Sequence, residues 1–271
     1  MSVSFINKVL DNDKTIFYAW FESMHTRIDI ALCNRPEDTC KTIIDLIYNE
    51  LQGIEKTVNR FDPNGELYLL NESASAHPVI VSPELFRIIK DCIDYYDKTS
   101  GCFDVTVNSS DSFRDGIKGI VCNDLDNSIF YKNTAIKIDL GGYAKGYALD
   151  KCVEILRENG MTDALVNFGN SSVFGLGNHP SGDGWKITLP MADIKQDSFV
   201  ILHDECLSTS GNEEKKLHIK SPFDGQYIEA FNPVSVVTKD ASSGEVFSTA
   251  LFVSRTTGRK FFINFATIKY Q

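Results

Sequence analysis

Apolar and polar residues alternate along two stretches near the N-terminus, and a period of two is typical of β-strands. Residues 15–23 read TIFYAWFES, and residues 26–33 read TRIDIALC. The pattern therefore predicts a pair of strands over residues 15–33.

The spacing then changes to that of an amphipathic helix over residues 38–61, which we expect to be capped by Asp38 or Thr39. A turn is predicted directly after it, over residues 61–67, FDPNGEL. The apolar residues at helical spacing in this first helix are Ile43, Ile44, Ile47, Leu51, Ile54 and Val58.

A second helix is predicted after Ser82, which would cap it, with Pro83 at its first position and Gly101 past its end. A third is predicted from about Gly142 to Asn159, ended by Gly160. Strands or strand-rich sections are expected over residues 101–107, 119–133 (as a hairpin), 135–140, 163–208 and 227–240, with a short helix near 244–254 and a final strand at 260–268.

Strands and helices are thus grouped along the chain rather than strictly alternating. Grouping favours an α+β fold over a doubly wound parallel sheet. The sequence contains no long linker and no low-complexity segment, so we expect one domain over residues 1–271.

The composition is that of an ordinary globular protein, with 42% hydrophobic and 24% charged residues in 271. A formal net charge of −10 argues against a nucleic-acid partner, because binding to a phosphate backbone needs a basic face. It still allows one small phosphorylated ligand, which needs only a local site.

Charged residues interrupt the apolar residues of the first twenty positions, and no run approaches the roughly 20 apolar residues of a membrane span. Seven cysteines, an odd number without a C-x-x-C pair, suggest reduced thiols. We therefore expect a cytoplasmic protein without a membrane span. An exported protein whose leader has been removed is the alternative.

The stretch DLGGYAKGYALD, residues 139–150, places Lys145 in the first turn of the third predicted helix. A cation is unfavourable there, because a helix N-terminus carries partial positive charge and unsatisfied N–H groups. An anion such as phosphate is favoured at the same place. One interpretation is that an anionic ligand sits between Lys145 and the helix; the other is a common tight turn with a solvated lysine.

Two further positions could carry chemistry. Glu245 and Thr249 are four residues apart, so on a helix they share one face and could hold a hard divalent cation. The alternative is a glutamate favoured by the helix dipole and a packed threonine. His218 could act as a general base for a hydroxyl nucleophile, or it could be a structural histidine.

Two other motifs have simple interpretations. Arg60, Asp62 and Asn71 surround the predicted turn and are typical of a capped loop. Residues 170–172, Asn-Ser-Ser, match a glycosylation acceptor, which we attribute to chance in a chain expected to be cytoplasmic.

In their order, these stretches resemble the FAD:protein FMN transferase family, the ApbE-like flavin transferases. The resemblance runs from about Met24 to Phe265, and DLGGYAKGYALD is its most specific part. The other matching stretches are MHT, NRFDPNGEL with the later LN, TSGCFDVTV, ALVNFGN, STSGN, HIKSPFDG and STALFV.

The resemblance implies an α+β fold of the ApbE-like type, related to the T-fold, as a single domain with antiparallel sheets and packed helices. It also implies a Mg²⁺-dependent reaction in which FMN passes from FAD to a Thr or Ser hydroxyl of an acceptor flavoprotein and AMP is released. Two alternatives stay open: a relative that only hydrolyses FAD, and a degenerate, non-enzymatic member that binds a flavin or a partner protein.

The resemblance also implies a role for individual residues. His218 would be the base for the acceptor hydroxyl, and Lys145 would face the ribityl-pyrophosphate of FAD. The metal ligands would be the carbonyl of Gly142 with Glu245 and Thr249. The other expected FAD contacts are Met24, Cys102, Phe103, Asp104, Asp139 and Ile219.

The chain departs from the family pattern at three places. Glu245 stands where the family usually has Asp, and its additional methylene moves the carboxylate by roughly 1.5 Å. Residues 108–116 replace a longer segment that covers the flavin, and Asn170 stands where a second glycine is common.

Overall fold

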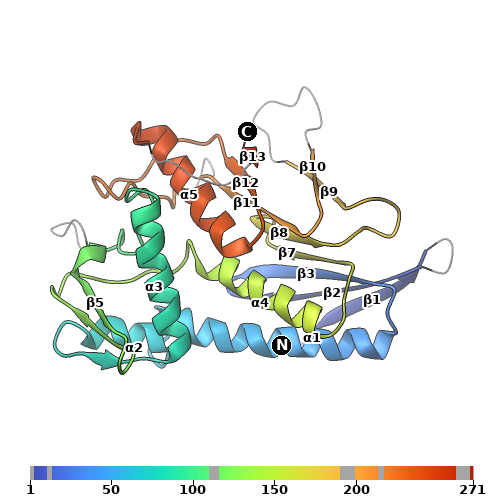
Figure 1. Cartoon of the computed structure of the whole chain (residues 1–271), viewed down its shortest axis with the longest axis horizontal. Helices are drawn as coiled ribbons and strands as arrows, with labels where there is room; N and C mark the ends of the chain where they lie inside the picture. The colour runs from blue at the N-terminus through green and yellow to red at the C-terminus, as the bar shows by residue number, and fades with distance from the viewer. Residues whose placement is uncertain are drawn as a thin grey trace.

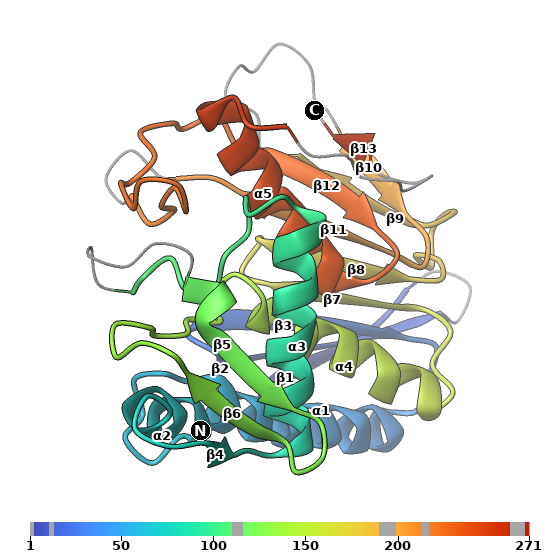
Figure 2. The same cartoon turned by 60° about the vertical axis from the view of Figure 1, so that its left-hand side comes forward.

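The computed structural model describes residues 3–10, 14–109, 116–189, 199–212, 217–260 and 269–270, and these form an α+β fold, as the sequence predicts (Figures 1 and 2). Its largest sheet has eight antiparallel strands in the spatial order β1-β2-β3-β7-β8-β11-β12-β13. These strands are β1 (Ser4–Val9), β2 (Thr15–Ser23), β3 (Thr26–Cys33), β7 (Ala164–Phe168), β8 (Ser172–Leu176), β11 (Glu205–Ser210), β12 (Val234–Thr238) and β13 (Lys269–Tyr270).

Three helices pack on one face of this sheet: α1 (Glu37–Val58), α4 (Ala144–Glu158) and α5 (Ala241–Thr257). The inward residues alternate along the strands, so that Phe17, Ala19 and Phe21 of β2 all lie in the main core. The antiparallel pair β9 (Trp185–Thr188) and β10 (Phe199–Leu202) packs on the opposite face, in a second small core. The strand pair predicted over residues 15–33 is thus confirmed. Alternate residues of these strands face either the main core under the helices or the second, smaller core on the opposite face.

A smaller region beside the sheet contains α2 (Glu66–Ser73), α3 (Pro83–Lys98) and a three-stranded sheet of order β4-β6-β5 (Figure 2). The strands are β4 (Val79–Ile80), β5 (Ile120–Asn123) and β6 (Ser128–Tyr131), and β5 follows a short 3₁₀ turn at Gly116–Gly119. The predicted hairpin at 119–133 is confirmed.

The start of α3 agrees with the cap predicted from the sequence, but the start of α1 does not. The hydroxyl of Ser82 accepts a hydrogen bond from the amide of Leu85 at 3.2 Å, so the predicted cap of α3 is confirmed. The predicted cap of α1 by Asp38 or Thr39 is wrong, because α1 begins at Glu37 after Pro36 and no side chain caps it. Its first turn instead carries carboxylates, which the helix dipole favours.

α2 was not predicted, because residues 66–73 directly follow the expected turn and carry only a weak helical pattern. Two features of tertiary structure stabilise this helix. Glu66 accepts a hydrogen bond from the Ser82 hydroxyl at 2.7 Å, and the buried side chain of Asn71 reaches across to residue 138.

Residues 101–107 and 135–140 are not strands, contrary to the sequence pattern. The second segment is held by a side chain instead of a neighbouring strand. The amide of Asn71 donates to the Ile138 carbonyl at 2.9 Å and accepts from the Ile138 N–H at 2.8 Å. The two segments also meet, because the N–H of Asp139 donates to the Val105 carbonyl at 2.7 Å. Their backbone groups are therefore satisfied without a ladder.

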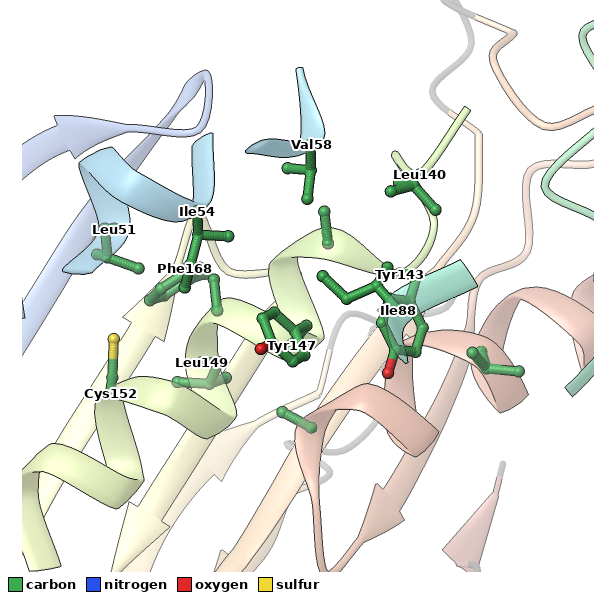
Figure 3. Close-up of a cluster of buried hydrophobic side chains, with 14 of the residues drawn as sticks. Leu51, Ile54, Val58, Ile88, Leu140, Tyr143, Tyr147, Leu149, Cys152 and Phe168 are labelled. Atoms are coloured by element: carbon green, nitrogen blue, oxygen red, sulfur yellow. The ribbon is translucent and has the colours of Figure 1, made fainter. Parts of the chain in front are cut away.

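α4 crosses α5 at very short range. A Cβ on Gly146 would lie 2.5 Å from the Ala241 carbonyl oxygen and 2.8 Å from Ser242 Cα. One turn later, Asp150 accepts hydrogen bonds from the N–H groups of Ala241 and Ser242 at 2.6 and 2.9 Å. On its other side α4 packs against α1 and β7, as the side chains in Figure 3 show.

The last third of the chain differs from prediction in two respects. α5 has 17 residues and begins at Ala241, with Asp240 as its cap, so it is longer than the helix predicted near 244–254. Within 227–240 only β12 is a strand, because residues 228–233 form an irregular loop. The strand predicted at 260–268 lies almost entirely outside the described residues.

Among the described helices, none combines the length and the apolar character that crossing a membrane requires.

We expect Gly146→Ala to destabilise the protein, because the added methyl group would overlap the backbone at the start of α5. Overpacking of this kind costs about 1–3 kcal/mol. Gly53→Ala in α1 is the matched control, since a Cβ on Gly53 would have no atom within 4 Å and alanine should stabilise an exposed helix by about 0.5–1 kcal/mol. Denaturant unfolding of both variants measures the two effects, and equal free energies of unfolding would contradict the close crossing.

Candidate active site

One cavity of about 510 Å³ lies between four elements. They are the turn after α3, the start of α4, the end of β11 and one face of α5. It brings together segments that are more than 100 residues apart in the sequence. Of the residues that the sequence predicted for the site, it is lined by Cys102, Phe103, Asp104, Asp139, Gly142, Lys145, His218, Ile219, Glu245 and Thr249.

Asp139 lies at the beginning of the turn that leads into α4, and both of its carboxylate oxygens are engaged. One accepts from the Gly141 N–H at 3.0 Å. The other accepts from the Asn108 side-chain amide at 2.8 Å and lies 3.1 Å from the Arg60 guanidinium. Asp139 thus fixes the two-glycine turn, and Arg60 belongs to the site rather than to a simple capped loop.

Lys145 is the second residue of α4, in the first turn as predicted, and it is not a solvated surface lysine. Its ammonium group donates a hydrogen bond to the Ser171 hydroxyl at 2.6 Å. It also lies 3.6 Å from a carboxylate oxygen of Glu245, in α5. The same oxygen accepts a hydrogen bond from the Ser172 hydroxyl. A cation at this helix start is therefore balanced by a buried carboxylate.

The two serines are placed by the tight turn between β7 and β8. Gly169 and Asn170 have φ angles of 58° and 61°, the left-handed conformation that such a turn requires. Asparagine tolerates this conformation, and Asn170 also exchanges hydrogen bonds with Asn167 at 2.9 Å. Asparagine in place of the family's second glycine is therefore accommodated.

The three residues predicted to hold Mg²⁺, a cation that prefers hard oxygen ligands, all line the cavity. Glu245 and Thr249 lie one turn apart on α5, and the Thr249 hydroxyl is 2.9 Å from the Ser210 hydroxyl. Within the part of the chain that the structure describes, no three His, Cys, Asp or Glu side chains form a metal-binding group. The predicted ligand set contains only one such side chain, Glu245, so it would not form a group of that kind. Its other members are the Thr249 hydroxyl and the Gly142 carbonyl, and three oxygen ligands fit Mg²⁺.

The turn after α3 forms an apolar wall of the cavity. Phe103 is buried, and its ring lies 3.4 Å from where a Cβ on Gly142 would be. Asp104 accepts hydrogen bonds from the N–H and hydroxyl of Thr106 at 2.7 and 2.6 Å, which shapes the turn. Burial raises the pKa of the Cys102 thiol to about 11, so it is protonated at neutral pH and is a poor nucleophile.

His218 lies at the rim of the cavity and its side chain is exposed, whereas Ile219 is buried. The side chain of Asn212 holds this segment, because its oxygen accepts from the N–H groups of His218 and Ile219 at 3.0 and 3.1 Å. An exposed imidazole at the rim can reach a group presented by another protein.

Met24 does not line this cavity. It lines an adjoining hollow of about 160 Å³, which shares Asp139 and Lys145 with the larger cavity. Met24 and His25 form the turn between β2 and β3 with φ angles of 52° and 58°, and the Met24 N–H donates to Glu55 at 2.8 Å. A two-residue turn between antiparallel strands takes positive φ at both positions, so the hairpin itself accounts for these angles.

Several residues in and next to the cavity are not predicted from the sequence. Ser171 lines the cavity and contacts Lys145, and the fully buried Ser172 donates to Glu245, whereas the sequence indicates only a chance glycosylation motif at these positions. No local pattern marks them, because their role comes from the pairing of β8 next to β11 beneath α5. Further lining residues that were not predicted include Asn108, Gly141, Thr209, Ser210, Lys220 and Pro222.

Known proteins share this fold. The structure of an ApbE protein from Thermotoga maritima aligns with a TM-score of 0.77 over 89% of this chain and 87% of that chain, at 23% sequence identity. The flavin transferase ApbE from Vibrio cholerae aligns with a TM-score of 0.78 over 100% of this chain and 97% of that chain, at 18% identity. At such identities the likeness shows the fold.

Sequence comparison extends the similarity. A protein from Klebsiella pneumoniae named FAD:protein FMN transferase is 24% identical over 257 residues, which cover 83% of this chain and 76% of that protein. The model of the ApbE family matches residues 24–268, which agrees with the extent expected from the motifs. The chain therefore belongs to the ApbE family.

Proposed function

We propose that this protein is a FAD:protein FMN transferase, which moves FMN from FAD to a Thr or Ser hydroxyl of an acceptor flavoprotein and releases AMP. The observation that carries the proposal is the cavity itself. It gathers from four separate segments every residue expected for this reaction except Met24, which lines the adjoining hollow. Relatives named for this activity, including those from Klebsiella pneumoniae and Chlamydia pneumoniae, support it.

Phosphoryl transfer depends mainly on positioning and on neutralising charge. Glu245, Thr249 and the Gly142 carbonyl would hold Mg²⁺, which when bound neutralises negative charge on the pyrophosphate. Lys145 would supply a second positive charge from the start of α4, where the helix dipole also favours an anion. Asp139 and the wall around Phe103 would orient the nucleotide and exclude water from one side of it.

His218 would complete the reaction at the rim of the cavity. Its imidazole takes the proton from the acceptor hydroxyl while that oxygen bonds to the phosphorus of the FMN half. The bond between this phosphorus and the bridging oxygen breaks, and AMP leaves with that oxygen. With water in place of the acceptor hydroxyl, the same site would hydrolyse FAD to FMN and AMP.

The proposal includes a cytoplasmic location. It is supported by the seven cysteines, which are all unpaired and of which six are buried.

Incubation with FAD and Mg²⁺, followed by chromatography, should show AMP, with FMN either free or attached to an added acceptor flavoprotein. His218→Ala should lower the rate of AMP release about 100-fold or more, because general bases contribute on that scale. His203→Ala is the control, since this exposed histidine lies in the turn between β10 and β11. FAD binding without any AMP would instead support the non-enzymatic alternative.

Glu245→Gln should weaken Mn²⁺ binding in the presence of AMP by about tenfold or more, because it removes the only carboxylate of the expected ligand set. Glu245→Asp, which restores the family's usual residue, should bind Mn²⁺ at least as well as the wild type. Glu205→Gln is the control for loss of one negative charge, since Glu205 pairs with Lys239 away from the cavity. Titration calorimetry measures all three, and unchanged binding by Glu245→Gln would remove Glu245 from the site.

A further inference from the structure

The two charges expected to bind opposite ligands are paired with each other. Lys145 Nζ lies 3.6 Å from Glu245 Oε1, and the two side chains are 28% and 8% exposed. An ion pair with one partner this buried is less screened by water than a surface pair. Without ligands, Lys145 and Glu245 therefore stabilise each other. A nucleotide bound to Lys145 would have to replace Glu245 as its partner, and a cation bound to Glu245 would have to replace Lys145.

Neighbouring serines hold both halves of this ion pair in place. Ser171 accepts a hydrogen bond from Lys145 at 2.6 Å and itself donates to the Phe168 carbonyl at 3.1 Å. Ser172 is fully buried and donates to Glu245. The turn between β7 and β8 and the first residue of β8 thus hold each half of the pair at a second point, in addition to the helices that carry the two side chains.

We propose that this ion pair makes the site bind a divalent cation and a pyrophosphate-containing nucleotide cooperatively, with Lys145 competing against the cation and Glu245 competing against the anion. The inference rests on the proposed function, because it concerns the same residues. It adds a form of regulation: neither ligand alone is bound at full strength.

The binding of the cation and the binding of the anion are thermodynamically linked. A cation bound to Glu245 must displace Lys145 or tolerate its positive charge nearby, and an anion bound to Lys145 faces the charge of Glu245 in the same way. When both ligands bind, one ion pair is exchanged for two, so each ligand raises the affinity of the other by the same factor. A ligand that binds more tightly when Lys145 and Glu245 are separated shifts the equilibrium toward the separated state.

Removal of one partner should therefore strengthen the binding of the ligand that this partner opposes. Lys145→Met should bind Mn²⁺ alone more tightly than the wild type, although it loses a contact for the nucleotide. Glu245→Gln should bind inorganic pyrophosphate alone more tightly, although it loses a metal ligand. A lysine that only contacts phosphate, and a glutamate that only binds metal, would not produce these gains.

The experiment is titration calorimetry of the full chain with two separate probes, Mn²⁺ alone and pyrophosphate alone in the presence of a chelator. We expect Mn²⁺ to bind Lys145→Met at least about fivefold more tightly, and pyrophosphate to bind Glu245→Gln more tightly by a similar factor, on the scale of ordinary coupling between sites. Lys151→Met is the matched control, because Lys151 is on the same helix but pairs with Glu154. It should change neither affinity.

Unchanged or weaker Mn²⁺ binding by Lys145→Met, with unchanged pyrophosphate binding by Glu245→Gln, would overturn the inference. AMP release by the wild type would then leave the proposed function standing. Conversely, both gains in affinity without any AMP from FAD would support the coupling and reject the transferase. Failure of every variant and of the wild type to bind either probe would also overturn the inference, while AMP release from FAD would still decide the proposed function. The two arms use different variants, so a folding defect in one still leaves the other decisive.

Discussion

The close crossing of α4 and α5 is the constraint on which the rest of the site depends. Only glycine at position 146 lets the two helices approach so closely, and Asp150 then accepts the first N–H groups of α5. This contact sets the position of α5 relative to α4. Because Lys145 is next to Gly146 and Glu245 lies one turn into α5, the same contact brings their charges together.

The crossing also explains the composition of the interface beneath the site. Burial raises the pKa of Asp150, while the Ser242 hydroxyl and two backbone N–H groups lower it by stabilising the charged form. A layer of hydroxyl groups continues from there between α5 and the sheet: Ser172, Ser208, Ser210, Thr238 and Ser248. Glycine at position 244 suits this layer, since a Cβ there would lie 2.7 Å from the Ser208 hydroxyl and 2.8 Å from the Thr238 hydroxyl.

The sequence predicts well wherever a regular period decides the structure. Strands β2 and β3 and helices α1, α3 and α4 follow from alternation, helical spacing or end signals. It fails at residues 101–107 and 135–140, where apolar residues alternate but no ladder forms. In the second segment the side chain of Asn71 replaces the neighbouring strand. Most of the site follows from the family motifs. Ser171 and Ser172 could not, because their partners on α4 and α5 are fixed only by tertiary packing.

The bonds made by Asn71 have a consequence for local stability. The segment that carries Asp139 lies outside the large sheet. Separate hydrogen bonds to Asn71, Ser109 and Val105 hold its backbone, and its apolar side chains Ile136, Ile138 and Leu140 are buried in the main core. A strand in a ladder opens only with its neighbours, whereas a segment held by individual contacts opens with the local unit that those contacts define. Opening of this wall of the cavity therefore requires Asn71 to release the Ile138 backbone, but it leaves the hydrogen bonds of the eight-stranded sheet intact.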